Sequence, residues 1–135
     1  MPTDLPVSLQ HFLEKPNPAV MATTTKDGRP VTVATWYQLE PDGRILVNLD
    51  AERVRLRHLR RDPRFALDVL DAGNWYTHVA LRLDVVEIMD DTHMSDIDAL
   101  SEHYVGAPYD NRTRPRVSVR ASITDWMGWN TSPED

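Results

Sequence analysis

Apolar positions recur along the chain with two different spacings, and these predict where helices and strands lie. Between Ser8 and Lys15 the apolar side chains are three or four residues apart and two prolines follow, which predicts a short opening helix. The runs AVMATTT and PVTVATWYQL flank KDGR, whose Asp-Gly pair favours a tight turn. A second Asp-Gly pair, in EPDGRILVNL, precedes a third strand over Arg44–Leu49. The pattern therefore predicts an antiparallel meander of three strands.

The segment DAERVRLRHLRRDPR combines helical spacing with a high density of charge. Val54, Leu56 and Leu59 stand among its charged residues and predict a short helix. The helix is expected to end at Asp62, because a proline disfavours helical backbone in the residue before it. The runs RFALDVLD and NWYTHVALRLDVVEI then predict two further strands on either side of an Ala-Gly pair.

The last third of the chain predicts one more helix and one more strand. Ser95 and Asp98 resemble a capping box at the start of a helix. The closing run PRVSVRASITDW alternates apolar and polar side chains, which is typical of a strand with one buried face. Because the order of elements contains no repeated strand–helix–strand unit, we expect an α+β fold around an antiparallel sheet or barrel.

Length and composition limit the classes of protein that remain. A chain of 135 residues fits one domain, 1–135, with Thr131–Asp135 expected as a frayed tail. The absence of cysteine excludes disulfides, thiolate metal sites and thiol nucleophiles. No apolar run approaches the roughly 20 residues of a membrane span, and Met1–Glu14 lacks the features of a signal peptide. We therefore expect a soluble, cytoplasmic protein without a membrane partner.

The charge pattern points to a local anion site. The formal net charge is −6, which argues against general polyanion binding, yet one short segment holds six arginines, Arg53, Arg55, Arg57, Arg60, Arg61 and Arg64. Positive charges in the first turn oppose the helix dipole by about 0.3–1 kcal/mol each when exposed, and a bound anion reverses that cost. We therefore assign Arg53, Arg55 and Arg57 to an anion and the three later arginines to structural roles.

Other chemistries find little support in the residue pattern. The histidines show neither HxxxH nor HExxH spacing, so no metal site is predicted. Neither GxSxG nor GxGxxG occurs, which argues against a serine hydrolase and against a Rossmann nicotinamide site. Nucleic acid is a rival ligand for the arginines, but none of the four tryptophans lies among them and no recognition motif is present, so no nucleic-acid partner is expected.

The series ATTTKDGRPVTVATWY, RILVNLDAERVRLRHLRRDPRFAL, NWYTHVALRLDVVEI and IDALSEHYVGAPY, followed by an arginine-rich strand, resembles the pyridoxamine 5′-phosphate oxidase-like split β-barrel superfamily. Within it, the order of motifs is most similar to the small deazaflavin (coenzyme F420)-dependent oxidoreductases. The resemblance covers residues 8–129. It implies an antiparallel split β-barrel with a few short helices, and a homodimer whose two chains share a cofactor groove.

The resemblance also assigns roles to particular residues. It places the cofactor phosphate at Arg53, Arg55 and Arg57, polar cofactor contacts at Asn48 and His58, the strand edge beside the ring at Thr35 and Trp36, and a groove aromatic at Trp75. Tyr104 and Tyr109 fall near the implied substrate mouth. They are candidate catalytic residues, although tyrosines in such a motif are more often packing residues.

These implications predict an oxidoreductase that uses coenzyme F420 for hydride transfer to a small conjugated organic acceptor. The cofactor performs the chemistry, so no catalytic side chain and no metal are required. Two alternatives stay open. One is an FMN-dependent enzyme of the pyridoxamine-phosphate oxidase type, and the other is a non-catalytic module that binds a cofactor or nucleic acid.

Overall fold

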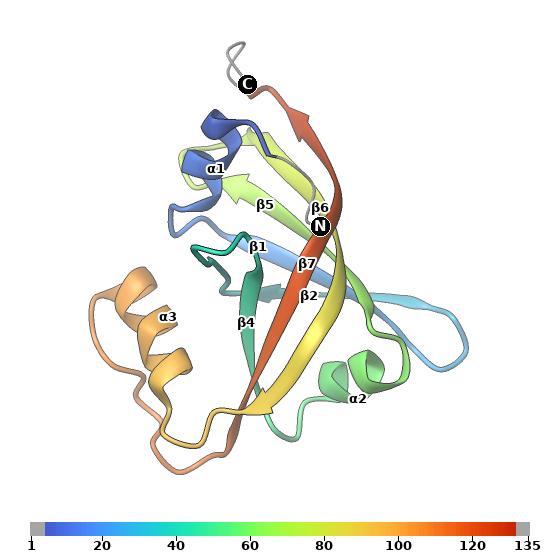
Figure 1. Cartoon of the computed structure of the whole chain (residues 1–135), viewed down its shortest axis with the longest axis vertical. Coiled ribbons are helices and arrows are strands. Elements are labelled where there is room, and N and C mark those ends of the chain that lie inside the picture. Colours follow the sequence, from blue (N-terminus) through green and yellow to red (C-terminus); the bar gives the residue numbers. More distant parts are fainter. Residues whose placement is uncertain (1–4, 132–135) are drawn as a thin grey trace.

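The computed structural model describes residues 5–131 as three short helices and seven strands (Figure 1). The helices are α1 (Val7–Leu13), α2 (Val54–Arg61) and α3 (Ser95–Val105). The strands are β1 (Ala19–Thr24), β2 (Pro30–Thr35), β3 (Gln38–Leu39), β4 (Ile45–Asp50), β5 (Arg64–Asp71), β6 (Asn74–Asp90) and β7 (Arg116–Trp129). The last strand thus runs beyond the predicted end, and residues 132–135 of the predicted tail lie outside the described residues.

All seven strands belong to one antiparallel sheet in the order β2-β1-β5-β6-β7-β4-β3. The predicted first hairpin is confirmed, since β1 and β2 pair from Ala19↔Thr35 to Thr24↔Pro30. The predicted three-stranded meander is wrong. Its second strand breaks after Thr35 into β2 and β3, and only the two-residue β3 pairs with β4. β2 therefore lies at one edge of the sheet, and β4 lies beside the other edge.

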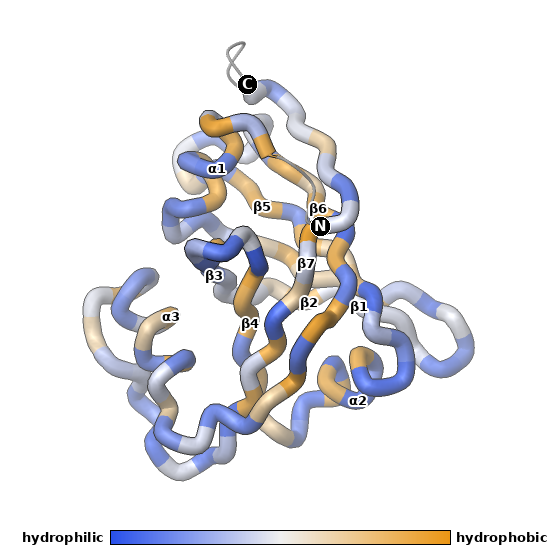
Figure 2. The backbone as a smooth tube through the Cα atoms, in the orientation of Figure 1, coloured by the Kyte–Doolittle hydropathy of each residue, from blue (hydrophilic) through white to orange (hydrophobic). Residues whose placement is uncertain are grey.

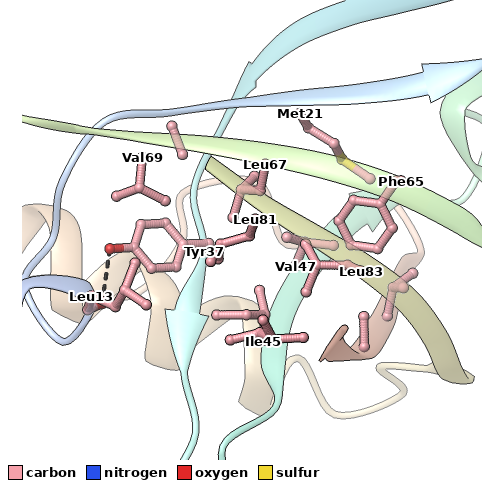
Figure 3. Close-up of a cluster of buried hydrophobic side chains, with 14 of the residues drawn as sticks. Leu13, Met21, Tyr37, Ile45, Val47, Phe65, Leu67, Val69, Leu81 and Leu83 are labelled. Carbon is pink, nitrogen blue, oxygen red and sulfur yellow. Dashed lines mark hydrogen bonds between the residues drawn. The ribbon is translucent and has the colours of Figure 1, made fainter. Parts of the chain in front are cut away.

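Tyr37 explains why the second predicted strand breaks. Its side chain is fully buried, and its hydroxyl donates a hydrogen bond of 2.8 Å to the carbonyl of Leu13 at the end of α1 (Figure 3). Because Tyr37 is anchored in the core, the chain leaves its pairing with β1 after Thr35, and β2 ends there. The sheet curls into a barrel that stays open between the β2 edge and the β3–β4 edge. The predicted α+β split barrel is therefore confirmed, and the barrel is not closed.

The core fills the inside of this barrel with alternating residues from the strands. Figure 2 shows the hydrophobic positions along the central strands, and Figure 3 shows Met21, Ile45, Val47, Phe65, Leu67, Val69, Leu81 and Leu83 gathered together. The apolar positions of the predicted alternation in β7 are confirmed, because Val117, Val119, Ala121 and Ile123 are all buried; Ser118 is buried too, on the side where it donates to Asp96 of α3. Full burial of a Val, Leu, Ile or Phe side chain contributes about 1.5–3 kcal/mol. The strand pattern thus determines the inner face of the barrel.

α2 begins directly after β4 and lies against one end of the barrel. Its apolar side chains Leu56 and Leu59 are buried in the core, whereas Arg57, Arg60 and Arg61 are exposed on the outer side. The helix ends where expected, since Asp62 has extended backbone (φ −129°, ψ 102°) ahead of Pro63.

α3 lies apart from the barrel core, over the outer side of β4 (Figure 1). The predicted capping box is wrong, because the N-cap residue is Met94, in the left-handed region at φ 60°, and Ser95 is already in the helix. Asp91 takes over the capping role through its carboxylate. It accepts hydrogen bonds from the backbone N–H groups of Asp96 (3.2 Å) and Ile97 (2.9 Å).

Candidate functional site

A cavity of 470 Å³ opens at the split between the two edges of the sheet. β2 lines it on one side, β4 on another, and the apolar face of α3 covers it with Ile97 and Leu100. Its volume lies within the range of about 300–1,000 Å³ in which proteins bind small molecules. Five predicted site residues meet here, namely Thr35, Trp36, Asn48, Tyr104 and Tyr109.

The strand edges beside this cavity carry free hydrogen-bonding capacity. Within the described chain β2 pairs only with β1, and β4 beyond Leu46 pairs only with β7. Unpaired backbone groups on such edges are available to a ligand that enters the split. The hydroxyl proton of Thr35 is not available to a ligand, because the hydroxyl donates it to the carbonyl of Trp36 at 3.0 Å.

Aromatic rings form one wall of the cavity. The rings of Trp36 and Tyr104 are stacked, with centroids 5.4 Å apart and an interplanar angle of 11°. Tyr109 meets Trp36 edge-on at 6.2 Å. Flat stacked rings of this kind offer a surface to a planar ligand.

Tyr104 is held in place by its hydroxyl group. The hydroxyl donates to the backbone carbonyl of Asn17 at 2.7 Å and accepts a long hydrogen bond of 3.4 Å from the N–H of Tyr37. Burial raises the pKa of Tyr104 to about 12. Its proton therefore faces a backbone acceptor, which supports a packing role; the predicted catalytic roles of Tyr104 and Tyr109 stay predictions.

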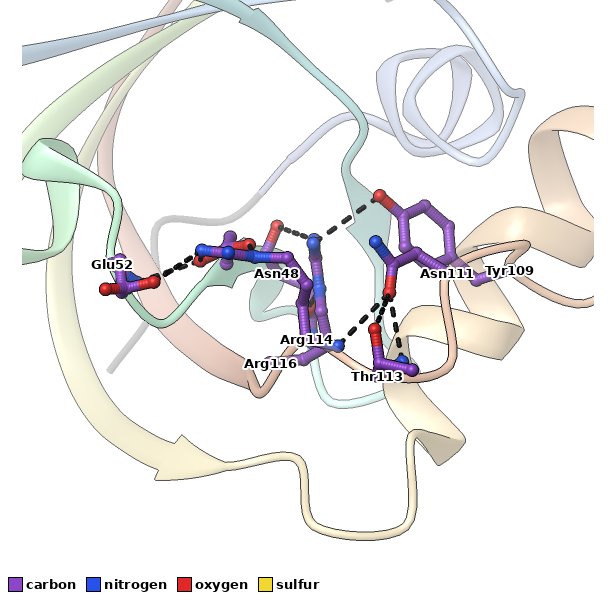
Figure 4. A network of polar contacts seen from close by, with 8 residues as sticks. Asn48, Glu52, Tyr109, Asn111, Thr113, Arg114 and Arg116 are labelled. Carbon is purple, nitrogen blue, oxygen red and sulfur yellow. Dashed lines mark hydrogen bonds and ion pairs between the residues drawn. The ribbon is translucent and has the colours of Figure 1, made fainter.

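Asn48 and Arg116 form the polar end of the cavity (Figure 4). The Nε of Arg116 donates to Oδ1 of Asn48 at 2.9 Å, and the guanidinium carbon lies 4.8 Å from the ring centroid of Tyr109. The Asn48 side-chain nitrogen in turn donates to Asp91 and Ser118, both at 3.1 Å. The sequence analysis did not single out Arg116. Its alternation with Ser118 and Arg120 in β7 places the three on one face, but only the position of α3 shows which of them lines a cavity.

The predicted phosphate residues lie at the start of α2. Arg53 is the N-cap residue and Arg55 lies in the first turn, half-buried, with Nη1 at 3.6 Å from the sulfur of Met21. In residues 5–131 neither Arg53, Arg55 nor Arg57 has a carboxylate within ion-pair distance.

Positive charge gathers between the start of α2 and the cavity. Burial, followed by the charges of Arg53 and Arg116, lowers the pKa of Arg55. Arginine nevertheless stays protonated in proteins at neutral pH. The charges of Arg53 and Arg116 therefore both act on Arg55.

The later arginines of the segment include two with structural partners, as predicted. Arg61 donates to the backbone carbonyl of Thr24, and Arg64 makes a two-pronged ion pair with Asp62. Arg60 is exposed on α2. Both contacts lie at the C-terminal end of α2, and none of these arginines lines the cavity.

Two predicted site residues lie outside the cavity. His58 is only 6% exposed, and its Nδ1 lies 2.9 Å from the hydroxyl of Thr23, so it ties α2 to β1. Trp75 is 67% exposed at the start of β6 and stacks on Tyr76 with centroids 4.6 Å apart. Within the described part of one chain, neither side chain lines the cavity.

Neither a metal-binding cluster nor a membrane-spanning helix is found among the described residues. Across residues 5–131 no cluster of three or more histidine or acidic side chains is placed to hold a metal ion. In the same range no helix has both the length and the apolar character needed to cross a bilayer.

An unclosed antiparallel barrel of this topology, with a ligand-sized cavity at its opening, is the architecture of the split-barrel proteins. The family model described as pyridoxamine 5′-phosphate oxidase matches residues 5–130. The chain belongs to this family, whose superfamily consists of oxidoreductases with the split-barrel fold.

Solved structures share the fold. A protein named F420 reductase superposes with a TM-score of 0.80 at 23% identity, covering 87% of this chain and 94% of its own. A conserved hypothetical protein from Mycobacterium tuberculosis gives a TM-score of 0.73 at 24% identity, covering 95% and 86%. An FAD- and heme-binding protein from Mycobacterium smegmatis gives 0.67 at 16%, covering 96% and 73%. No match is found among curated proteins.

Proposed function

We propose that this chain is an oxidoreductase that binds the deazaflavin coenzyme F420 and reduces a small conjugated organic acceptor. The observation that carries the proposal is the pair of cations without acid partners at the start of α2, Arg53 and Arg55, together with a cavity that has an aromatic wall. The solved structure named F420 reductase, which shares the fold, adds support.

The residues of the chain fit such a cofactor in three respects. Arg53 and Arg55 supply charge-assisted hydrogen bonds to a phosphodiester at the start of a helix, where backbone N–H groups also favour an anion. The exposed Arg57 lies further along α2, where it meets the chain of glutamates that follows the phosphodiester of F420. The Trp36–Tyr104 wall orients a planar ring and keeps water from one of its faces. When bound, the deazaflavin supplies hydride transfer, and the protein supplies binding and orientation.

The proposal includes a homodimer. Exposed aromatic and apolar side chains gather where β6 begins and β7 ends, near the β5–β6 turn, namely Trp75, Tyr76, Met127 and Trp129, each at least 60% exposed. Tyr76 and Trp129 line one hollow there. A patch of this kind is typical of a protein interface. A second copy covering it accounts for the exposed Trp75 as a residue of a shared groove.

FMN is the second candidate cofactor, and the match to the pyridoxamine 5′-phosphate oxidase family model favours it. FMN ends in one phosphate, whereas F420 carries a phosphodiester followed by glutamates and so spreads its charge along α2. Exposed charge pairs are screened over about 10 Å at 0.1 M salt. Affinity for F420 is therefore expected to depend on salt more steeply than affinity for FMN.

The experiment is a titration of both cofactors into the apo-protein at two salt concentrations, followed by tryptophan fluorescence. We expect tighter binding of F420 than of FMN, with the difference narrowing at high salt. Tighter FMN binding under both conditions would assign the chain to the FMN-dependent enzymes. Tighter binding of single-stranded DNA than of either cofactor would replace the enzyme by a nucleic-acid-binding module.

A further inference from the structure

Arg116 differs from the other arginines of the segment that leads into β7 and along it. Arg112 pairs with Asp98 at 2.6 Å, and Arg120 pairs with Glu40 at 2.9 Å. Arg114 pairs with both Asp50 and Glu52 (Figure 4). Arg116 has no carboxylate within ion-pair distance anywhere in residues 5–131. It alone among these four lines the cavity at the split.

Neutral groups hold the Arg116 guanidinium. Besides the bond from Nε to Asn48, Nη2 donates to the backbone carbonyl of Asn48 at 3.3 Å, and Nη1 donates to the hydroxyl of Tyr109 at 3.5 Å. An arginine has five N–H groups, so two remain without an acceptor in the described chain. Asp50, opposite Arg116 in the β4–β7 register, acts on its charge from beyond ion-pair distance, and its carboxylate is taken up by Arg114.

The orientation of Arg116 is built into the structure through Asn48. Asn48 is only 8% exposed, and its side-chain nitrogen donates to Asp91 and Ser118. Because both bonds require the nitrogen on that side, the Asn48 oxygen has to face Arg116. Asp91 and Ser118 are also buried, and Asp91 is fixed further by the start of α3. Asn48 is thus a positioning residue for Arg116.

The rest of the cavity has a different character. Beyond Arg116 and Asn48 its lining is dominated by aromatic and aliphatic side chains, with Trp36, Tyr104, Ile97 and Leu100 among them. An apolar, flat-walled cavity with one fixed cation at its end is complementary to a planar ligand that carries one anionic group. A planar guanidinium matches a carboxylate especially well.

We propose that Arg116 is the anion subsite of the substrate, and that the substrate is a planar conjugated carboxylate whose body lies against Ile97 and Leu100, which leaves the Trp36–Tyr104 wall to the cofactor ring. Arg53 and Arg55, at the start of α2, serve the phosphate of the cofactor and are separate from this subsite. The identification of the ligand as the acceptor of a reductase rests on the proposed function, whereas the subsite itself does not.

The test compares two ligands of nearly equal shape that differ in charge. 2-Naphthoate and the neutral 2-naphthamide are titrated into the cofactor-free protein by calorimetry. We expect wild type to prefer naphthoate by roughly tenfold or more, as for one hydrogen bond to a charged group. The preference should vanish in Arg116→Gln. It should persist in Arg82→Gln, the matched control, whose exposed guanidinium pairs with Asp125 outside the cavity.

Arg116→Lys keeps the charge and provides a second variant should the glutamine protein fail to fold, as judged by circular dichroism. It is expected to retain a reduced preference for naphthoate. Equal affinity of wild type for the two ligands, or an unchanged preference in both Arg116 variants, would overturn the proposal.

A cofactor titration separates this inference from the proposed function. F420 and FMN affinities should fall much less in Arg116→Gln than in Arg55→Ala, because Arg116 acts on the phosphate site only through its charge at longer range. If Arg116→Gln weakens cofactor binding as much as Arg55→Ala does, Arg116 belongs to the phosphate site and the subsite is disproved. If neither cofactor binds but the naphthoate preference holds, the proposed function fails and the subsite stands.

Discussion

The carboxylate of Asp91 joins Asn48 on β4 to the start of α3. Its Oδ2 accepts a hydrogen bond of 3.1 Å from the Asn48 side chain and one of 2.9 Å from the backbone N–H of Ile97. Asp91 itself is only 7% exposed. One buried side chain therefore positions both the helix that covers the cavity and the polar residue at the end of the cavity.

Replacing this carboxylate should destabilise the fold and loosen the cavity. Asp91→Ala removes the cap of α3 and leaves the Asn48 amide short of an acceptor, at an expected cost of about 2–3 kcal/mol in the free energy of unfolding. Urea denaturation measures the loss. The exposed neighbour in Asp90→Ala is the control and should change the free energy by less than about 0.5 kcal/mol. Equal effects at the two positions would show that Asp91 has no special role.

The ion pairs of Arg114 with Asp50 and Glu52 predict a pH-dependent stability. The hydrogen bond from Arg114 is the main reason that the pKa of Asp50 lies well below its usual range. A carboxyl with a lowered folded-state pKa adds stability above the unfolded pKa of about 3.9, and this stability is lost as the pH falls through the folded pKa.

Arg114→Gln should therefore lower the free energy of unfolding by about 1 kcal/mol at pH 7, a modest value because Arg114 is partly exposed. The difference from wild type should shrink below about pH 4, where the unfolded chain takes up protons. Urea denaturation at several pH values measures it. Arg29→Gln breaks an exposed pair with Asp27 and serves as the control with little effect. A difference that grows toward acid pH would contradict the assignment.

The two arginines at the start of α2 should carry most of the cofactor affinity. Arg53→Ala and Arg55→Ala are each expected to weaken binding by about 1.5–3 kcal/mol, the range for hydrogen bonds to charged groups. Arg64→Ala should matter much less, because Arg64 is paired with Asp62. Fluorescence titration with F420 compares the three variants. The same loss at all three positions would mean that the segment acts only as a diffuse positive field.

Tyr104 should prove to be a packing residue. Tyr104→Phe keeps the stack on Trp36 but removes the hydroxyl that bonds to Asn17 and Tyr37, so the expected loss of stability is about 1–2 kcal/mol. Turnover by the cofactor-loaded enzyme should stay within about threefold of wild type, because general acid catalysis contributes about 100-fold or more when it operates. A larger fall in rate, in a variant shown to be folded, would instead make Tyr104 the proton donor.

The exposed patch on β6 and β7 should hold two chains together. Light scattering at micromolar concentration is expected to give twice the mass of one chain, and Trp129→Glu should shift the protein toward the monomer. Val7→Glu changes a side chain of similar exposure on α1 and should leave the dimer intact. A wild-type monomer in the presence of saturating cofactor would rule the dimer out.

The sequence predicted features that depend on neighbouring residues. The tight turns at the Asp-Gly pairs, the end of α2 at Asp62 and the alternating burial of Val117 to Ile123 follow from backbone preferences and side-chain period, which act over a few residues. The arginine cluster was visible for the same reason, since its members lie close together in one short segment of the chain. The resemblance to a family added the expectation that the strands form a split barrel.

Only the tertiary structure decided how distant segments meet. Burial of Tyr37 against α1 broke the second predicted strand, so β2 and β4 lie near opposite ends of the sheet rather than as neighbours in a meander. Asp91 replaced Ser95 as the cap of α3 because the chain reverses direction at the end of β6. Asn48 and Arg116 are 68 residues apart, and their contact depends on the pairing of β4 with β7. Such long-range pairs are selected by the free energy of the whole fold, and no local pattern encodes them.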